Sequence, residues 1–292
     1  MNYLSNLDFF SFSVLIVFSI TFLIQLFYYL FFFLRIAFYK EPETKAIKQF
    51  PISIIICAKN EAARLEVFLP SVLEQDYPDY EVIVVNDGSD DGTEDILKLY
   101  QNKYEKLYVT TIPRSRNFGH NKKLAISIGL KAAKHDWVLL TDADCKPVTN
   151  EWIKLMQQKF DEKTDFVIGY GGYKTVKGFL NKIIRYDTIT IALQYFTFAM
   201  AKIPYMGVGR NLAYRKSIFF QNKGFSQHLH LASGDDDLFV NENANKQNLQ
   251  ISLNQKTFTE SIPKKRFKDW FYQKKRHITT AKYYKRENIS LF

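Results

Sequence analysis

A long, mostly hydrophobic stretch without any charge lies near the beginning of the chain. The run from Phe9 to Leu34 has 26 residues, and none of them is charged. As an α-helix it would be about 39 Å long, and the hydrocarbon core of a bilayer is roughly 30 Å thick, so a tilted helix can cross a membrane. A buried core helix is the alternative, but such helices rarely lack a polar face. A cleaved signal peptide would begin with basic residues, whereas the only early charge here is Asp8.

Basic residues follow this run, and none precedes it. They are Arg35, Lys40, Lys45 and Lys48. The positive-inside rule therefore places the N-terminus outside and the rest of the chain in the cytoplasm. We expect residues 1–40 to be a single-pass anchor in the plasma membrane or bacterial inner membrane. Residues 41–50 are then a charged linker, and residues 51–292 a cytoplasmic domain.

Short apolar runs alternate with helical periodicity between about residues 50 and 160. The predicted strands lie in PISIIIC, YEVIVV, KLYVTTIP and DWVLL. The helical patterns lie in EAARLEVFLPSVLEQ, DDGTEDILKLYQNKY and NKKLAISIGLKAAKHD. This order predicts an α/β fold, with a mostly parallel, Rossmann-like sheet and helices on both of its faces. Ligands of such sheets bind at the carboxyl ends of the strands.

Polar residues follow three of the predicted strands. The three clusters are Ala58–Lys59–Asn60–Glu61, Asn86–Asp87–Gly88–Ser89 and Thr141–Asp142–Ala143–Asp144. If the strands are parallel, all three clusters lie on one edge of the sheet. This edge is a candidate binding site.

Asp142 and Asp144 are separated by a single residue, so they can converge on one point at the end of a strand. Two converging carboxylates repel each other unless a positive charge lies between them. Mg²⁺ or Mn²⁺ fits this arrangement, because both prefer oxygen ligands and accept phosphate oxygens as well. The alternatives are a pair of solvated turn carboxylates, or a helix cap by Asp142.

Charge and cysteine content narrow the partners further. The net charge is +10 and the pI about 9.3, which favours an anionic partner such as nucleic acid, anionic lipid or a nucleotide phosphate. The two cysteines, Cys57 and Cys145, form neither a disulfide framework nor a Cys/His metal spacing. A reducing, cytosolic environment is the simplest interpretation.

Four stretches together resemble the family 2 glycosyltransferases, which have the GT-A fold. They are SIIICAKNEAARL, VIVVNDGSDDGT, NKKLAISIGLKAAKHDWVLLTDADC and GDDDL. The resemblance covers roughly residues 50–285. It implies a nucleotide-sugar half over residues 51–145 and an acceptor half over residues 146–292.

The resemblance also implies roles for individual residues on the donor side. The aspartate that would bind the nucleotide base is Asp87, and the residues along the nucleotide would be Ala58, Asn60 and Glu61. The Asp142 and Asp144 pair would hold the ribose-diphosphate and the metal. In GHNKKLA, either Lys122 or Lys123 would lie near the diphosphate, with a solvated helix start as the alternative for both.

Residues on the acceptor side follow from the same resemblance. The acids of LASGDDDLFVN stand where the family keeps its catalytic base, and two registers fit, giving Asp236 or Asp235. We favour Asp236. Gln273 and Arg276 resemble a QxxRW motif of membrane-bound members, in which Arg276 would meet the diphosphate. His277 stands at the position of the tryptophan, which leaves the acceptor geometry and processivity open.

The second half also has apolar and basic helical patterns. GFLNKIIRYDTITIALQYFTFAMAK predicts a helix that contacts the membrane interface, with a core helix as the alternative. The C-terminal stretch PKKRFKDWFYQKKRHITTAKYYKR is basic and aromatic, which favours contact with membrane lipids.

The sequence thus predicts metal-dependent, inverting transfer of a sugar from a nucleotide sugar, by default a UDP-sugar, to a polysaccharide, lipid or lipid-linked acceptor. A nucleotidyltransferase is an alternative, but CAKNEAARL lacks the glycine-rich phosphate loop of that class. A membrane-anchored nucleic-acid-binding protein is another. We expect no nucleic-acid partner, because the acidic strand ends would repel a phosphate backbone.

Overall fold

A computed structural model describes residues 8–41, 48–114, 121–229, 231 and 233–285. Most of the predicted 41–50 linker, and Gly119 and His120 of the GHNKKLA stretch, lie outside these residues. The strands are β1 (Ile52–Ala58), β2 (Tyr80–Asp87), β3 (Leu107–Ile112), β4 (Trp137–Asp142), β5 (Cys145–Pro147), β6 (Phe166–Gly169), β7 (Gly171–Tyr173), β8 (Leu212–Arg215), β9 (Leu249–Ser252) and β10 (Thr259–Ser261).

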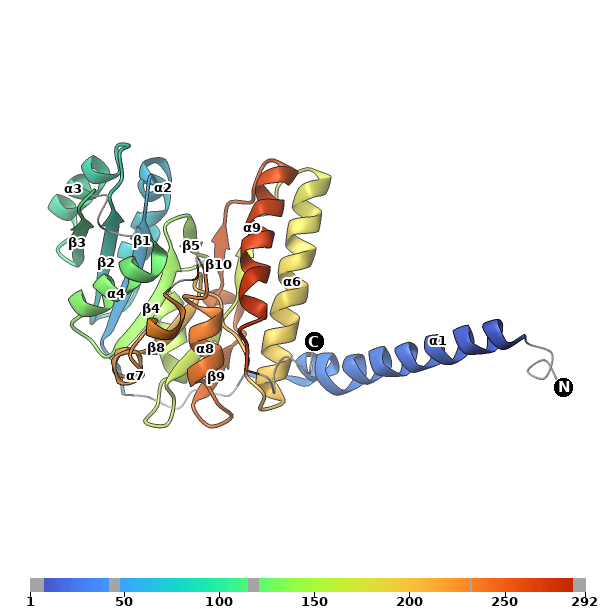
Figure 1. Ribbon diagram of the computed structural model, residues 1–292. Coiled ribbons are helices and arrows are strands. Elements are labelled where there is room, and N and C mark those ends of the chain that lie inside the picture. The colour runs from blue at the N-terminus through green and yellow to red at the C-terminus, as the bar shows by residue number, and fades with distance from the viewer. Residues whose placement is uncertain (1–7, 42–47, 115–120, 230, 232, 286–292) are drawn as a thin grey trace.

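The helices cover both faces of the sheet and extend beyond it (Figure 1). The longer ones are α1 (Phe9–Phe27), α2 (Ala62–Leu73), α3 (Thr93–Lys103), α4 (Lys122–Ala132), α6 (Phe179–Met200) and α9 (Phe267–Ala281). The shorter ones are η2 (Tyr28–Phe32), η3 (Phe33–Phe38), α5 (Trp152–Met156), η4 (Gln157–Lys159), α7 (Lys216–Gln221), η5 (Ser226–His228), α8 (Asp237–Asn243) and η6 (Gln255–Thr257).

The central sheet has seven strands in the order β3-β2-β1-β4-β8-β6-β9. The first four strands are parallel to their neighbours, and β8 is antiparallel to both β4 and β6. The predicted mostly parallel α/β sheet is therefore confirmed. A small second sheet, in the order β5-β10-β7, lies beside the carboxyl end of β4.

Alternate side chains of the central strands enter two separate cores. Ile54 and Ile56 of β1 pack against the apolar faces of α2, α3 and α5. Ile55, between them in sequence, faces the opposite core, which contains α4, α6 and α8. This alternation follows from the two-residue period of a strand. Because both faces are covered, the strands carry nearly continuous apolar runs rather than an alternating pattern.

The segment from Asp165 to Thr175 is divided between the two sheets. It forms β6 in the central sheet and β7 in the small sheet, and Tyr170 lies between them. The Tyr170 carbonyl accepts hydrogen bonds from the Thr259 backbone N–H and the Asn211 amide. These bonds hold the chain at the point where it passes from one sheet to the other.

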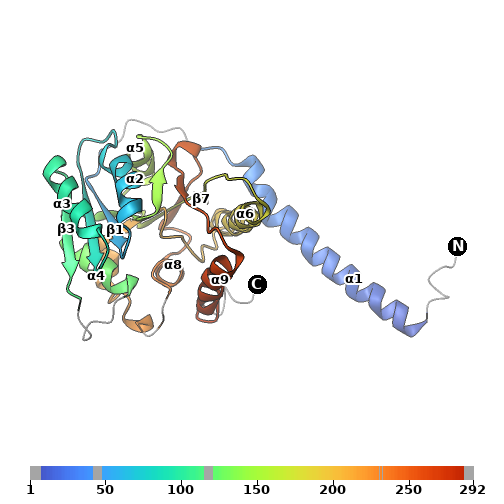
Figure 2. The same ribbon diagram turned by 90° about the horizontal axis from the view of Figure 1, so that it is seen from above.

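The predicted N-terminal helix is present and projects away from the sheet (Figure 2). The helical segment Phe9–Phe38 has a mean hydropathy of 2.3 in its most apolar window, which is long and apolar enough to cross a membrane. None of that window is buried in the protein. The C-terminal end of this helical segment packs against the domain, because the ring of Phe32 stacks on Phe198 of α6 with 4.3 Å between centroids.

Candidate active site

Three predicted polar clusters do share one edge of the sheet. In the register of the parallel strands, Ala58 of β1 pairs with Asn86 of β2, and Cys57 pairs with Asp142 of β4. The polar turns after these strands therefore begin at the same level. Asp87, the last residue of β2, is almost fully buried at this edge, with the Lys59 ammonium 3.8 Å from its carboxylate.

The turn after β1 is connected to the turn after β2. Asn60 has a positive φ of 57°, a conformation that asparagine tolerates better than most residues. Its backbone N–H donates to the Ser89 hydroxyl, and its side-chain oxygen accepts from the Asp90 N–H. The Glu61 N–H donates to the Thr93 hydroxyl. These bonds give the two turns a fixed arrangement without a ligand, as a preformed binding edge requires.

Carboxylates at the end of β4 form a candidate metal site. Ligand atoms of Asp142, Asp144 and Cys145 lie within 4.8 Å of one another. Asp144 also accepts a 3.0 Å hydrogen bond from the Ser261 hydroxyl of β10. Burial raises the pKa of the Cys145 thiol well above its usual value, so the neutral thiol is a poor ligand. The two carboxylates provide the hard oxygen ligands that fit Mg²⁺ or Mn²⁺.

Lys122 joins the donor and acceptor parts of the site. Its ammonium lies 2.8 Å from Asp142 and 3.2 Å from Asp235. Burial opposes its charged form, but the surrounding carboxylates outweigh this and raise the pKa of Lys122 well above its usual value. For Asp142, burial acts to raise the pKa, yet the nearby Lys122 ammonium prevails and lowers it. The pair is therefore fully ionised at neutral pH.

The three successive aspartates before and in α8 have three different environments. Asp235 faces Lys122. Asp237 faces α9, accepting hydrogen bonds from the Thr280 hydroxyl and, at 3.0 Å, from the Tyr284 hydroxyl. Asp236 accepts from the backbone N–H groups of Gly209, at 2.6 Å, and of Asp237.

The pKa of Asp236 is unusual. Burial, together with the neighbouring carboxylates of Asp235 and Asp237, raises the pKa of Asp236 to about 7. A carboxylate with this pKa can take up a proton near neutral pH, as a general base must. Asp235 is paired with the Lys122 ammonium. Asp237 has its Oδ2 occupied by the hydroxyl groups of Thr280 and Tyr284, and its Oδ1 accepts from the Leu238 N–H.

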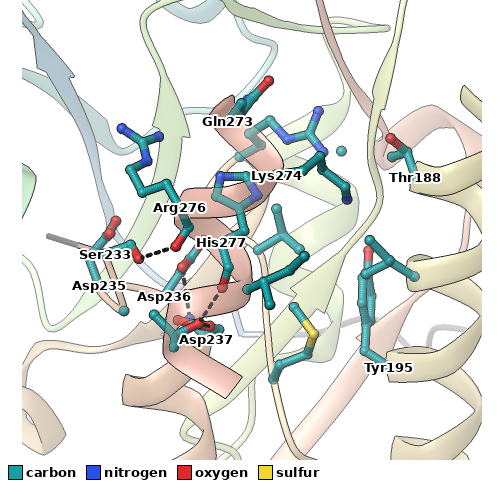
Figure 3. Close-up of a pocket in the computed structure, with 18 of the residues that line it drawn as sticks. Thr188, Tyr195, Ser233, Asp235, Asp236, Asp237, Gln273, Lys274, Arg276 and His277 are labelled. Carbon is teal, nitrogen blue, oxygen red and sulfur yellow. Dashed lines mark hydrogen bonds between the residues drawn. The ribbon is translucent and has the colours of Figure 1, made fainter. Parts of the chain in front are cut away.

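A pocket of about 730 Å³ contains these acids at one end (Figure 3). Its walls are α6, the segment 205–210, the start of α8, and α9, which lies beside α6 (Figure 1, Figure 2). Gln273 and Arg276 line it from α9, as does His277. The Gln273 amide also approaches the Tyr173 hydroxyl at 3.4 Å.

The structure brings some predicted site residues into this pocket and leaves others outside. Lys122, Asp142, Asp235, Asp236, Gln273 and Arg276 line it. Ala58, Asn60, Glu61 and Asp87 lie instead along the sheet edge that the strand register defines. Lys123 points away from both, since its buried ammonium donates to the carbonyls of His228 and Leu231.

Arg210 was not among the predicted site residues, yet it lies in the pocket. Its guanidinium donates to the Gly172 carbonyl at 3.2 Å and lies 4.5 Å from the centre of the Tyr173 ring. It also contributes to the field that lowers the pKa of Asp142. The sequence offered a signal, because Arg210 follows the glycine-rich turn YMGVG, but no spacing relates that turn to β4.

The sequence matches a family model and several known proteins. The model of Glycosyl transferase family 2 matches residues 53–220. The Bacillus subtilis (strain 168) protein named "Probable glycosyltransferase YdaM" is 30% identical over 184 residues, which are 59% of this chain and 42% of that protein. The hyaluronan synthase of Pasteurella multocida is 36% identical over 98 residues, 33% of this chain and 10% of the synthase. The chain thus spans less than half the length of these relatives.

Solved structures show the same fold. The mannosyltransferase PcManGT from Pyrobaculum calidifontis, in complex with GDP-Man and Mn²⁺, has a TM-score of 0.61 and 21% identity, covering 80% of this chain and 64% of that one. S. aureus TarS 1-349, in complex with UDP-GlcNAc, has a TM-score of 0.53 and 20% identity, covering 74% and 59%. These likenesses confirm the predicted GT-A fold. With the family model matched over more than half of its residues, the chain belongs to glycosyl transferase family 2.

Proposed function

We propose that this protein transfers a sugar from a UDP-sugar to a hydroxyl of a polysaccharide, lipid or lipid-linked acceptor, with inversion at the anomeric carbon. The reaction takes place at the cytoplasmic face of the membrane. Residues 1–40 are the anchor, and residues 51–292 are the catalytic unit. Membrane lipids are then partners of the protein, and nucleic acid is not.

The contact of Lys122 with both Asp142 and Asp235 carries the proposal. It brings the metal-site end of β4 and the acids at the start of α8 into one charged cluster. A donor whose diphosphate lies at Asp142 would therefore have its sugar close to Asp236. Proximity of this kind converts the attack on the donor into an effectively intramolecular step.

The transfer requires one proton acceptor. The acceptor hydroxyl attacks the anomeric carbon from the face opposite the diphosphate, and its proton passes to the Asp236 carboxylate. A new bond forms between the hydroxyl oxygen and the anomeric carbon. The bond from that carbon to the phosphate oxygen breaks, and the nucleoside diphosphate leaves with the electron pair. Lys122 and Arg210 are placed to offset its developing negative charge.

Asp142 and Asp144 are the residues that would hold a divalent metal. When bound, Mg²⁺ or Mn²⁺ would neutralise charge on the diphosphate leaving group. Asp87 is placed to bind the nucleotide base, and Ala58, Asn60 and Glu61 to line the nucleotide. The solved structural relatives bind GDP-Man in one case and UDP-GlcNAc in the other, so the donor nucleotide needs a direct comparison.

A donor-binding assay on the full chain in detergent tests the proposal. Binding of UDP-GlcNAc, UDP-glucose and GDP-mannose would be measured with and without Mn²⁺, in the natural protein and in Asp144→Asn. We expect Mn²⁺ to tighten binding of the UDP-sugars, and Asp144→Asn to weaken that binding by about tenfold or more. Asp95→Asn, an exposed aspartate on α3, is the matched control.

Two results would contradict the proposal. One is that a folded protein binds none of these donors in the presence of Mn²⁺. The other is that Asp144→Asn keeps the full Mn²⁺ dependence. Preference for GDP-mannose would retain the reaction but replace the donor class.

A further inference from the structure

We propose that the apolar end of the pocket binds the hydrocarbon chain of a membrane-borne acceptor, whose headgroup hydroxyl then lies at Asp236. This inference rests on the proposed function and names its acceptor class. It makes the acceptor an amphiphile rather than a free oligosaccharide or an extended polysaccharide.

The pocket is lined by charged, polar and apolar side chains. Lys122 and the acids at the start of α8 are its charged group, and Tyr195 of α6 lies across the pocket from the acids (Figure 3). The apolar lining, which we call the apolar end, consists of Ile191, Tyr195, Tyr205, Met206, Val208 and Ile278, with the polar Thr188 and Gln194 beside them on α6. A sugar chain needs hydrogen-bonding partners, which the aliphatic groups do not supply, whereas a hydrocarbon chain gains free energy from contact with them. The polar end and the apolar end together fit an amphiphile.

The apolar end is connected to the membrane-helix candidate by ring contacts. Phe32, at the end of that helix, stacks on Phe198 of α6. Phe198 packs edge-on against Tyr205 in the pocket wall, with 5.5 Å between centroids. Tyr205 in turn lies 6.0 Å from Tyr284, whose hydroxyl donates to Asp237. The protein therefore has continuous packing from the segment that would leave the bilayer to the acids of the site.

The apolar wall also reaches the outer surface of the protein. Ile278 lines the pocket from α9 and is 69% exposed. A hydrocarbon chain in the pocket would leave it past this residue, which suits a lipid whose remaining tail stays in the bilayer.

An ion pair joins the two helices that border this pocket. Lys274 of α9 and Asp187 of α6 lie 2.5 Å apart, and both line the pocket. The bridge fixes the spacing of the two helices. A preformed groove reduces the ordering cost of binding a flexible chain.

Photo-crosslinking tests the inference on the full chain in phosphatidylcholine nanodiscs. The probe is octyl β-D-glucoside with a diazirine at the end of its chain, and labelled residues are identified by mass spectrometry. We expect saturable labelling of α6, the segment 205–208 and α9, which excess octyl glucoside removes and free glucose does not. Labelling of α1, which contacts lipid directly, would not saturate.

A matched pair of methionine variants shows where the hydrocarbon chain of the probe binds. Met206→Gln places an amide in the apolar end and should raise the half-saturating probe concentration about tenfold. Met200→Gln makes the same change at a partly buried methionine that is not among the described pocket-lining residues, and it should leave saturation unchanged. Equal effects of the two variants would overturn the inference, as would labelling confined to α1.

Donor binding, measured on the same samples, separates this inference from the proposed function. Saturable pocket labelling without any binding of sugar nucleotides would retain the lipid site and reject the proposed reaction. The opposite result is metal-dependent donor binding and sugar transfer to soluble oligosaccharides, without pocket labelling. That result would retain the proposed reaction and reject the lipid site. In that case the acceptor is a growing polysaccharide.

Discussion

The chemistry of the candidate site depends on how differently three adjacent carboxylates are placed. Asp235 is neutralised by Lys122, and Asp237 is held by hydroxyl groups from the C-terminal part of the chain. Among the residues that the structure describes, the hydrogen-bond donors to Asp236 are backbone N–H groups, which leave its carboxylate able to accept a proton. Burial, followed by the two neighbouring carboxylates, raises the pKa of Asp236 above that of a solvated carboxyl group.

We predict that the rate of transfer follows the ionisation of Asp236. Because its pKa is about 7 and the base must be deprotonated, kcat/KM should rise about tenfold per pH unit below pH 7 and level off above it. Asp236→Asn should lower kcat by about 10²–10⁴-fold and leave donor affinity unchanged. The measurements are a pH–rate profile and a donor-binding titration.

The same raised pKa makes a prediction about stability. A carboxyl that binds its proton more tightly in the folded state stabilises the fold fully below its unfolded pKa, near 4. That contribution is lost as the pH rises through the folded pKa of about 7. Asp236→Asn should therefore raise the thermal midpoint at pH 8 more than at pH 5. In the rate measurement, an Asp236→Asn variant that kept the pH–rate profile of the natural protein would show that another group is the base.

At the scale of elements, the close approach of α4 to the sheet positions Lys122. Gly129, one of the buried residues of α4, faces β1 and β2. A Cβ atom there would lie 2.6 Å from the Cγ2 of Ile55 and 3.2 Å from the Cγ2 of Val85. Isoleucine is stiff at its branched carbon, so the contact cannot relax by rotation alone.

We predict that Gly129→Ala destabilises the protein, although alanine favours helices. Overpacking should lower the free energy of unfolding by about 1–2 kcal/mol after the gain in helix propensity. Denaturant unfolding of Gly129→Ala, Ile55→Ala and the double variant would measure this. Since Ile55→Ala removes the clashing methyl group, the double variant should be more stable than the sum of the single changes predicts. Simple additivity would show that the contact carries no strain.

The sequence predicts those helices and strands whose hydrophobic periodicity is contained in their own residues. The strands that begin at Ile52 and Tyr80 are largely apolar, and the parallel arrangement follows from their alternation with helices. The convergence of Asp142 and Asp144 follows from the period of a strand. Which of Lys122 and Lys123 lies beside Asp142 cannot be predicted from the sequence, because it depends on how α4 is rotated about its axis against its neighbours.

Contacts between segments that are distant in the sequence could not be predicted either. Ser261 donates to Asp144 from a strand 117 residues further along the chain. The break at Tyr170 arises because β10 supplies a second sheet, which no local pattern around Tyr170 indicates. Likewise, Arg210 reaches the site only because β8 inserts antiparallel beside β4.

For the whole molecule, the N-terminal helical segment packs against the α/β domain at its C-terminal end, through Phe32 of η2. Phe32 is 3% exposed and belongs to the same core as α4, α6 and β4. Its neighbour Phe31 is 45% exposed and contacts Phe27 and Arg35 of its own helical segment. The position of the helix thus affects α6, and through Phe198 and Tyr205 it affects the pocket wall.

We predict that Phe32→Ala destabilises the catalytic domain, whereas Phe31→Ala does not. Removing a buried ring should cost about 3 kcal/mol and lower the thermal midpoint measured by tryptophan fluorescence in detergent. Phe31 provides the same chemical change on the same segment at a ring that is 45% exposed, whose contact with the core is limited to the edge of Phe32. Because the α6 side of the pocket rests on this contact, Phe32→Ala should also weaken saturable pocket labelling by the octyl glucoside probe. Equal thermal midpoints for the two variants would mean that the helix only tethers the enzyme, and that the pocket is built without it.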